Sequence, residues 1–272
     1  MKKILFLVNH DVVIYNFRLE MVERFLKDGH EVHVASPNGE RIAELIKLGC
    51  VYHEYDLDRH GMNPIKEYRI LQYYKKLMKQ VAPDIVLGFT IKPNIYGAFA
   101  AKKWNIPFVA NITGLGTAVE NESFTQKIIV MLYKRAFKRV QRIFFQNKEN
   151  LEFFKSKKIA TDDKYILLPG SGVNLQRFQP LEYPLTESVE FVFISRIMKE
   201  KGIEQYLDAA EYITAKYPGT KFHICGFCEK EYEGRLDECV CKGIVIYHGM
   251  IRDVREVLRI THCTIHPTFY PE

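Results

Sequence analysis

The sequence predicts two α/β domains, each a doubly wound parallel sheet, of which the second is incomplete. Its 272 residues exceed the usual size of one domain, which is about 150 residues. Short apolar runs alternate with amphipathic stretches along the chain, the pattern of parallel strands joined by crossover helices. A stretch at 169–188 contains Gly170, Gly172, Pro180 and Pro184 with little periodic signal, so we place the linker there.

The first domain, residues 1–180, opens with the clearest βαβ unit. Residues 4–8 form an apolar strand, and a helix follows with apolar residues at helical spacing, Phe17, Met21, Val22, Phe25 and Leu26. Further strands are predicted at 31–35, 51–55, 84–89, 107–111, 142–146 and 164–168. Helices are predicted at 65–81, 95–104 and from residue 124 onward.

The second domain, residues 188–272, repeats the alternation. Its predicted strands are 189–195, 221–225, 244–247 and 263–266, and its predicted helices are 202–216, 230–240 and 252–260. No capping helix follows the last strand. We therefore expect a truncated domain and a natural chain that continues beyond Glu272.

Composition excludes several classes of protein. With 47% hydrophobic residues the chain is too apolar to be disordered. The net charge of +6 is compatible with an anionic ligand or membrane surface, and is too small for a dedicated nucleic-acid binder. The apolar run at the N-terminus is too short for a signal peptide, and no stretch reaches the roughly 20 apolar residues of a membrane span. These features predict a cytoplasmic protein whose six cysteines are free thiols.

The most informative local segment runs from Ser195 to Gly202, where a strand gives way to a helix. Ligands of open α/β sheets bind beyond the carboxyl ends of strands, and a helix N-terminus offers unpaired N–H groups. Arg196 can grip phosphate oxygens in bidentate fashion, and Lys201 adds a mobile charge. The segment therefore suits a diphosphate, although a solvated basic loop is an equally good interpretation from spacing alone.

Several motifs in order along the chain carry a family resemblance. Ser195-Arg196-x4-Lys201-Gly202 and the terminal His266-Pro-Thr-Phe-Tyr-Pro-Glu272 resemble the second domain of the family-4 retaining glycosyltransferases, which have the GT-B fold. Earlier segments resemble the first domain, namely Pro83-Asp84-Ile85-Val86, Lys92-Pro93-Asn94, Asn111-Ile112-Thr113-Gly114-Leu115-Gly116 and Pro169-Gly170-Ser171-Gly172-Val173-Asn174.

The resemblance implies transfer of a sugar from a nucleotide-sugar, most commonly a UDP-sugar, without a metal or other cofactor. Arg196 and Lys201 would stabilise the leaving diphosphate, and Glu272 would be the first carboxylate of the family's Glu-x7-Glu motif. Donor binding is further assigned to Ser195, Gly202, Gly226, Gly249 and Asn174. Since the second carboxylate would fall beyond residue 272, activity of this chain alone is in question.

The acceptor side departs from many relatives. Thr113 stands where they carry a histidine, and Leu87-Gly88-Phe89 replaces a frequent His-x-His. The Thr-Gly-Leu-Gly variant resembles the subgroup that builds bacterial capsule, O-antigen and other lipid-linked glycans. It implies a polyprenyl-diphosphate-linked saccharide as acceptor. The cleft residues are expected to be His10, Asp11, Asn16, Thr113, Gly114 and Gly116. For His10 and Asp11, an acid/base role competes with a simple polar turn capped by Asn16.

Residues 124–142 are predicted to form a helix with one basic side. That side carries Lys127, Lys134, Arg135, Lys138, Arg139 and Arg142. It suits contact with anionic lipid on the inner face of the cytoplasmic membrane, and it equally suits an ordinary solvated face.

Other interpretations also stay open. Cys225, Cys228, Cys239 and Cys241 have near-zinc spacing, but their positions at element ends favour packing over a metal site. A nucleotide-sugar epimerase of the same fold, or a non-catalytic protein that binds a membrane or a partner, are the competing functions.

Overall fold

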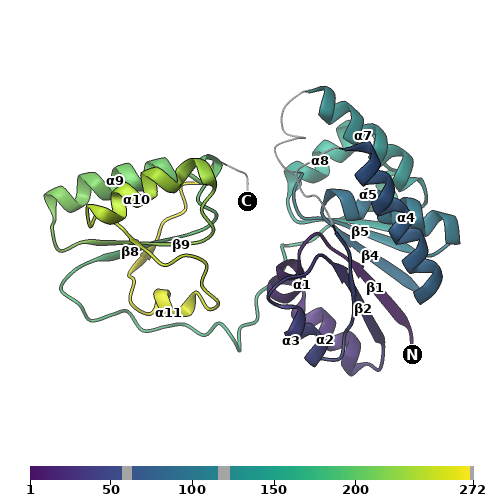
Figure 1. The fold of residues 1–272 in the computed structure, drawn as a ribbon, viewed down its shortest axis with the longest axis horizontal. Coiled ribbons are helices and arrows are strands. Elements are labelled where there is room, and N and C mark those ends of the chain that lie inside the picture. Colours follow the sequence, from purple (N-terminus) through teal and green to yellow (C-terminus); the bar gives the residue numbers. More distant parts are fainter. Residues whose placement is uncertain (57–62, 116–122, 270–272) are drawn as a thin grey trace. The chain divides into compact units, whose positions relative to one another are not determined.

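The structure is a computed structural model that describes residues 1–56, 63–115 and 123–269 (Figure 1). Its contacts divide the chain into two compact units, Met1–Asn174 and Leu175–Glu272. Each unit contains one parallel sheet with helices on both faces, which confirms the predicted α/β class.

The first unit is built on a seven-stranded sheet. Its strands are β1 (Lys3–Leu7), β2 (Glu31–Ser36), β3 (Val51–Glu54), β4 (Ile85–Phe89), β5 (Phe108–Ile112), β6 (Arg142–Phe145) and β7 (Tyr165–Leu167). They pair in the order β3-β2-β1-β4-β5-β6-β7, and every pair is parallel. The direction of winding reverses between β1 and β4, and such a switch point is where open α/β sheets bind ligands.

Helices cover both faces of this sheet. They are α1 (Asp11–Phe17), α2 (Leu19–Lys27), α3 (Ile42–Lys47), α4 (Pro64–Val81), α5 (Ile91–Trp104), α7 (Phe124–Ala136) and α8 (Lys148–Ser156). Side chains of β1 alternate between the faces: Leu5 and Leu7 join the core beneath α4, α5, α7 and α8, whereas Ile4 and Phe6 join the core beneath α1, α2 and α3.

Two helix predictions for this unit were wrong, and two further helices were missed. The first predicted helix is broken at Arg18 into α1 and α2. The long helix predicted from residue 124 ends at Ala136, because Phe137 and Val140 turn into the core through a short 3₁₀ segment, η1 (Phe137–Arg139). Helices α3 and α8 were not predicted, since six and nine residues are too few to show a clear period.

The second unit has a four-stranded sheet. Its strands are β8 (Glu190–Ile194), β9 (Lys221–Cys225), β10 (Ile246–Tyr247) and β11 (Cys263–Thr264), in the order β10-β9-β8-β11. One face is covered by α9 (Ile203–Lys216) and α10 (Glu233–Cys241), and the other by the short α11 (Arg255–Leu258) (Figure 1).

Each sheet contains a chain of one carboxylate and two histidines. In the first, Glu31 accepts from Nε2 of His33, and Nδ1 of His33 lies 2.8 Å from Nε2 of His53. In the second, Glu190 accepts from Nε2 of His223, whose Nδ1 lies 2.9 Å from Nε2 of His248. The carboxylate thereby fixes the tautomer of the inner histidine, and its Nδ1 accepts from the outer one.

We expect these chains to make stability depend on pH. Burial and then the neighbouring histidine lower the pKa of His53 and of His248 below 6.5. The unfolded chain therefore binds more protons than the folded one below about pH 6.5, so the free energy of unfolding falls as the pH drops from 7.5 to 5.5. Urea unfolding at several pH values measures this slope. The His53→Gln, His248→Gln double variant should flatten it, and an unchanged slope would contradict the assignment.

Candidate functional site

Loops that follow the strands of the second sheet converge at its carboxyl edge. Beyond β8, the backbone N–H of Ser195 donates to the Cys225 carbonyl at 3.1 Å, and that of Ile197 donates to the Phe227 carbonyl at 2.8 Å. The Glu229 N–H returns to the Ile197 carbonyl at 3.1 Å. The loops after β8 and β9 therefore continue to pair past the end of the sheet, which holds the Ser195–Gly202 segment in place.

Two close backbone approaches in this region require glycine. A Cβ on Gly226, whose φ is +144°, would lie 1.9 Å from the Ser195 carbonyl oxygen. A Cβ on Gly202, whose φ is +76°, would lie 2.0 Å from the Pro267 carbonyl oxygen. Since the Gly226 N–H also donates to the Gly249 carbonyl at 2.9 Å, the structure brings together four of the residues assigned to donor binding, Ser195, Gly202, Gly226 and Gly249.

The charged residues of the motif lie at the amino end of α9. Lys201 closes a 3₁₀ turn, η3 (Lys199–Lys201), directly before Gly202. The Arg196 side chain is 56% exposed, and its Nη1 lies 3.7 Å from a Glu229 carboxylate oxygen. Such an exposed, long ion pair is weak, so the guanidinium is available to an incoming anion. Two cations beside a helix N-terminus form an electropositive site.

A fourth loop, after β11, docks on the same segment. The Phe269 N–H donates to the Glu200 carbonyl at 2.9 Å, and the Thr268 hydroxyl donates to the same carbonyl at 3.4 Å. Glu272 lies outside the described residues. Asn174 belongs to the first unit, where its side-chain amide donates to Glu20, so it is not part of this cluster within the second unit.

In the first unit, the loop after β1 brings His10 and Asp11 together at the start of α1. His10 is the N-cap of α1, and its Nδ1 accepts from the Val12 N–H at 3.3 Å. Asp11 is fully buried and accepts from the Arg41 N–H at 2.7 Å, which ties α1 to the start of α3. The other carboxylate oxygen of Asp11 lies against Nδ1 of His10. The predicted cap at Asn16 was wrong, because Asn16 is exposed near the end of α1.

The carboxyl ends of β4 and β5 are fixed by a buried amide network. Asn94 donates to the Asn111 carbonyl at 2.9 Å, and the Asn111 amide donates to the Gly88 carbonyl at 3.3 Å. Thr113 and Gly114 follow β5 at this edge, and Gly116 lies outside the described residues.

The sequence patterns did not single out Arg18, a buried cation of this region. Arg18 is only 9% exposed and lies over the ring of Phe89 at the end of β4. A signal was present: Arg18 follows the buried Ile14 by four positions and precedes the buried Val22 by four, so a cation occupies the apolar side of the helical pattern.

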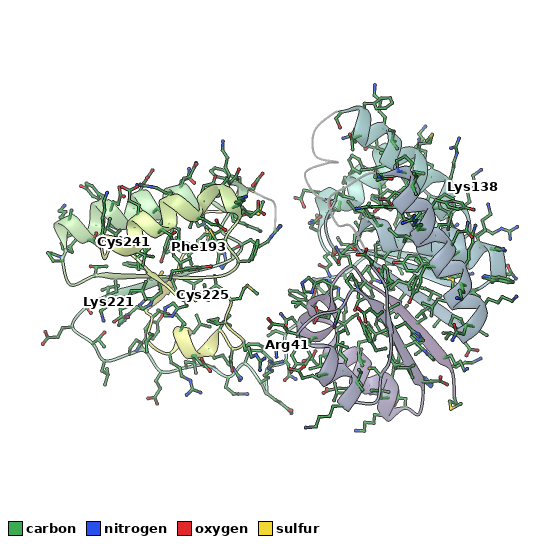
Figure 2. All side chains as sticks on the ribbon, in the orientation of Figure 1. Arg41, Lys138, Phe193, Lys221, Cys225 and Cys241 are labelled. Atoms are coloured by element: carbon green, nitrogen blue, oxygen red, sulfur yellow. The ribbon has the colours of Figure 1, made fainter. Side chains whose placement is uncertain are left out.

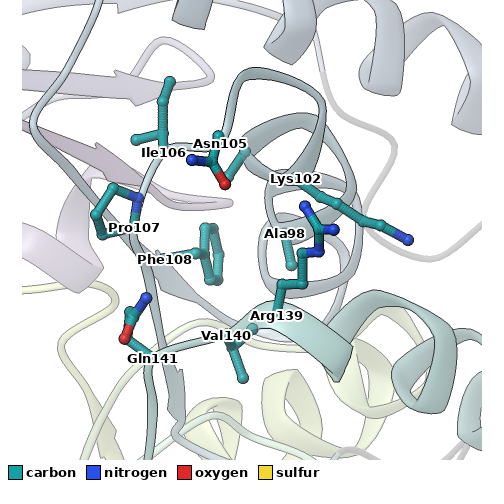
Figure 3. A pocket seen from close by; sticks show the side chains of 10 residues that line it. Ala98, Lys102, Asn105, Ile106, Pro107, Phe108, Arg139, Val140 and Gln141 are labelled. Carbon is teal, nitrogen blue, oxygen red and sulfur yellow. The ribbon is translucent and has the colours of Figure 1, made fainter.

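The basic residues predicted to share one helical face do not share one helix. Only Lys127, Lys134 and Arg135 are on α7; Lys138 and Arg139 are on η1, and Arg142 begins β6. All six are exposed, as Lys138 illustrates in Figure 2. Arg139 and Lys102 flank a cavity of about 220 Å³ beside Pro107 and Gln141 (Figure 3). This cavity is at the amino edge of β5 and β6, away from the carboxyl edge.

Of the four cysteines at near-zinc spacing, Cys225 and Cys239 pack into the cores of the second unit and Cys228 is half-buried, whereas the packing role predicted for Cys241 was wrong because Cys241 is exposed. Cys225 and Cys239 are buried in separate apolar clusters on opposite faces of the sheet, and Cys241 is exposed at the end of α10 (Figure 2). Burial raises the pKa of the Cys225 thiol to about 11, which keeps it protonated. Within residues 1–56, 63–115 and 123–269, no three His, Cys, Asp or Glu side chains converge as a metal site requires.

Two models of known protein families match this sequence. The family model described as "Glycosyl transferase 4-like" matches residues 3–147, and the model described as "Glycosyl transferases group 1" matches residues 178–272. The chain belongs to the glycosyl transferase 4-like family. This confirms the predicted family, and the enzyme is a glycosyltransferase.

Relatives of this glycosyltransferase agree with that assignment. A protein from Campylobacter jejuni, named N,N'-diacetylbacillosaminyl-diphospho-undecaprenol alpha-1,3-N-acetylgalactosaminyltransferase, is 26% identical over 282 residues, covering 97% of this chain and 74% of the relative. The crystal structure of Anabaena Alr3699/HepE in complex with UDP and glucose has a TM-score of 0.73 at 14% identity, covering 100% of this chain and 76% of that one. A glycosyltransferase from Rickettsia africae has a TM-score of 0.72 at 16% identity, covering 100% and 74%. These likenesses confirm the GT-B fold.

The glycine at 226 offers a test of the site's backbone. Because an added Cβ would meet the Ser195 carbonyl, Gly226→Ala should lower the free energy of unfolding by about 1–3 kcal/mol. Gly234 is an exposed position of α10 with no atom within 4 Å of an added Cβ. As a matched control, Gly234→Ala should raise stability by about 0.5–1 kcal/mol. Urea unfolding measures both, and equal effects would contradict the close approach.

Proposed function

We propose that this glycosyltransferase is a retaining enzyme that moves a sugar from a UDP-sugar to a polyprenyl-diphosphate-linked saccharide. The observation that carries the proposal is the convergence of Arg196, Lys201 and the amino end of α9 beyond the carboxyl ends of β8 and β9. UDP in the Anabaena structure supports the donor, and the diphospho-undecaprenol in the Campylobacter enzyme's name supports the acceptor. The product would enter a bacterial surface glycan such as capsule.

The proposed chemistry requires positive charge at the donor diphosphate. As the bond between the anomeric carbon and the diphosphate oxygen breaks, its electron pair passes to that oxygen, where negative charge grows. Arg196, Lys201 and the α9 N–H groups would stabilise this charge, most strongly in the transition state. We propose that they do so without a metal or another cofactor. Glu272 would contact the donor sugar.

The acceptor would bind to the first unit. Its carboxyl edge holds the switch point between β1 and β4, where the loops with His10, Thr113 and Gly114 also start. In this proposal His10 contributes polar contacts, and Asp11 holds the loop in shape.

We further propose a peripheral contact with the inner face of the cytoplasmic membrane. The amino ends of α4 and α7 follow the carboxyl ends of β3 and β5, and there Ile65, Tyr68 and Phe124 are 66%, 62% and 78% exposed, with Lys127 one turn into α7. Exposed apolar residues beside a cation suit a lipid interface. Among the helices that the structure describes, none has the length and apolar character needed to cross a membrane.

Loss of either cation should impair the chemical step. Arg196→Ala and Lys201→Ala should each lower kcat on the order of 100-fold or more, because each removes charge that stabilises the leaving diphosphate. Lys216→Ala, at the opposite end of α9, should leave kcat within about twofold and serves as the control. Release of UDP from a UDP-sugar with a polyprenyl-linked acceptor measures the rate. A decrease in kcat of less than about threefold for Arg196→Ala would contradict its proposed role in stabilising the leaving diphosphate.

The proposed membrane contact is tested by comparing variants on two surfaces of the first unit. The Ile65→Ser, Phe124→Ser double variant should reduce sedimentation with vesicles of phosphatidylglycerol and phosphatidylcholine by about tenfold, because it removes the exposed apolar contacts. Lys138→Glu with Arg139→Glu, on η1, should have a smaller effect. The reverse order would show that the basic end of η1 is the docking surface.

A further inference from the structure

A buried polar chain anchors the residue that follows β10. Oε2 of Glu190, at the start of β8, lies 2.8 Å from Nε2 of His223 on β9, and Nδ1 of His223 lies 2.9 Å from Nε2 of His248. The two imidazole rings stack with their centroids 5.2 Å apart. The side chains of Glu190 and His223 are 6% and 3% exposed, and Nζ of Lys221 lies 2.9 Å from the other carboxylate oxygen. The chain therefore links three neighbouring strands and ends on His248.

The end of β10 depends on this anchor, because the strand itself is weakly held. It consists of Ile246 and Tyr247, lies at the edge of the sheet and, in the sheet as described, pairs with β9 alone. Beyond it, the His248 N–H donates to the Ile224 carbonyl at 2.9 Å. Removal of the His248 imidazole would leave Nδ1 of His223 as a buried acceptor without a donor, which is unfavourable.

Residues on both sides of His248 hold Gly226, the glycine that follows β9. The Tyr247 hydroxyl donates to the Gly226 carbonyl at 2.9 Å, and the Gly249 carbonyl accepts from the Gly226 N–H at 2.9 Å. Both polar groups of the Gly226 backbone are thus bound by the end of β10. Displacement of this end would break both hydrogen bonds together.

Gly226 in turn sets the backbone of the segment assigned to the donor. An added Cβ would lie 1.9 Å from the Ser195 carbonyl oxygen, so the two backbones are in direct contact. The Ser195 N–H donates to the Cys225 carbonyl at 3.1 Å, which joins the same two loops. Since no space separates these loops, a shift of Gly226 moves Ser195 and with it Arg196.

We propose that His248 is a positioning residue of the donor site. The chain that starts at Glu190 fixes the end of β10, the end of β10 fixes Gly226, and Gly226 fixes the segment from Ser195 onward. His248 need not touch the donor to act in this way. The identity of the ligand, UDP, rests on the proposed function, whereas the coupling of His248 to Gly226 rests on the contacts alone. If the chain only stabilised the sheet, its loss would lower the free energy of unfolding and leave donor affinity unchanged.

The first unit contains a matched chain that holds no part of the donor segment. Glu31, His33 and His53 repeat the carboxylate and the two imidazoles, with both separations 2.8 Å and the ring centroids 5.1 Å apart. His53 belongs to β3, at the edge of the first sheet. A substitution at His53 therefore removes the same kind of hydrogen bond in the other unit and serves as the control.

Calorimetric titration of the whole chain with UDP tests the proposal. His248→Leu removes the N–H donor and should weaken UDP binding about fivefold or more. His248→Gln presents an amide N–H to His223 and should restore the affinity to within about twofold of the wild type. His53→Leu should lower the melting temperature as His248→Leu does, yet leave UDP affinity within about twofold of the wild type. UDP binding by His248→Leu that stays within this twofold range would overturn the proposal.

A second variant keeps the test valid if His248→Leu fails to fold. Tyr247→Phe removes the hydroxyl that holds the Gly226 carbonyl and retains the ring, which packs against the apolar cluster beneath α9 and α10. It should weaken UDP binding about threefold or more with little change in melting temperature. Unchanged UDP binding would show that Gly226 does not need the end of β10, and the proposal would fail.

Amide hydrogen exchange, followed by NMR, separates this proposal from the proposed function because it needs no ligand. The Gly226 amide should exchange about tenfold faster in His248→Leu than in the wild type and should not change in His53→Leu. If it does so while the wild type binds no UDP, the positioning role stands and UDP as the donor fails. If UDP binds and neither its affinity nor the exchange responds to His248→Leu, the positioning role fails and UDP as the donor stands. Faster exchange with unchanged UDP affinity would leave the chain a structural role only, which also overturns the proposal.

Discussion

Parallel strand pairing is the constraint on which both units depend. Every strand pair in the two sheets is parallel, so each chain segment that leaves a strand must cross over a face of the sheet and return to the opposite edge. All strand-to-helix loops therefore gather at the carboxyl edge. This places the Ser195–Gly202 segment beside the loops of Gly226, Gly249 and Pro267, and it places the start of α5 beside the loop after β1. Helix N-termini collect at the same edge, which gives both units electropositive surfaces there.

The arginines at the carboxyl edges of the two sheets differ in how far their side chains are exposed. In the second unit, Arg196 is more than half exposed and is held by one long contact with Glu229, so it can move onto a ligand at little cost. In the first unit, Arg18 is buried against Phe89. A mobile cation suits a diphosphate that must be bound, stabilised during bond cleavage and released.

The basic residues at the amino edge of the first sheet are explained by helix stability and need no ligand. Lys102 and Lys103 end α5, and Lys134 and Arg135 end α7, where cations stabilise the carbonyl end of a helix by about 0.3–1 kcal/mol each. The exposed apolar residues Ile65 and Phe124 have no such structural reason, because exposure of large apolar side chains brings no stability. For this reason the amino ends of α4 and α7 are the better candidates for a lipid interface than the basic residues as a set.

Local sequence patterns were sufficient to predict the α/β class, the two parallel sheets and the segment around Arg196 and Lys201, because strand and helix periods and strand-end motifs are short-range features. They also indicated the family, since several motifs occur in order. Only the folded structure shows that the first predicted helix breaks at Arg18 into α1 and α2, that the helix from Phe124 stops at Ala136, and that Asp11 is buried. The need for glycine at 226 and the burial of an unpaired Arg18 over Phe89 likewise arise from contacts between residues 31 and 71 positions apart. Contacts between such distant residues leave no periodic signal, so only the folded chain reveals which polar groups are compensated.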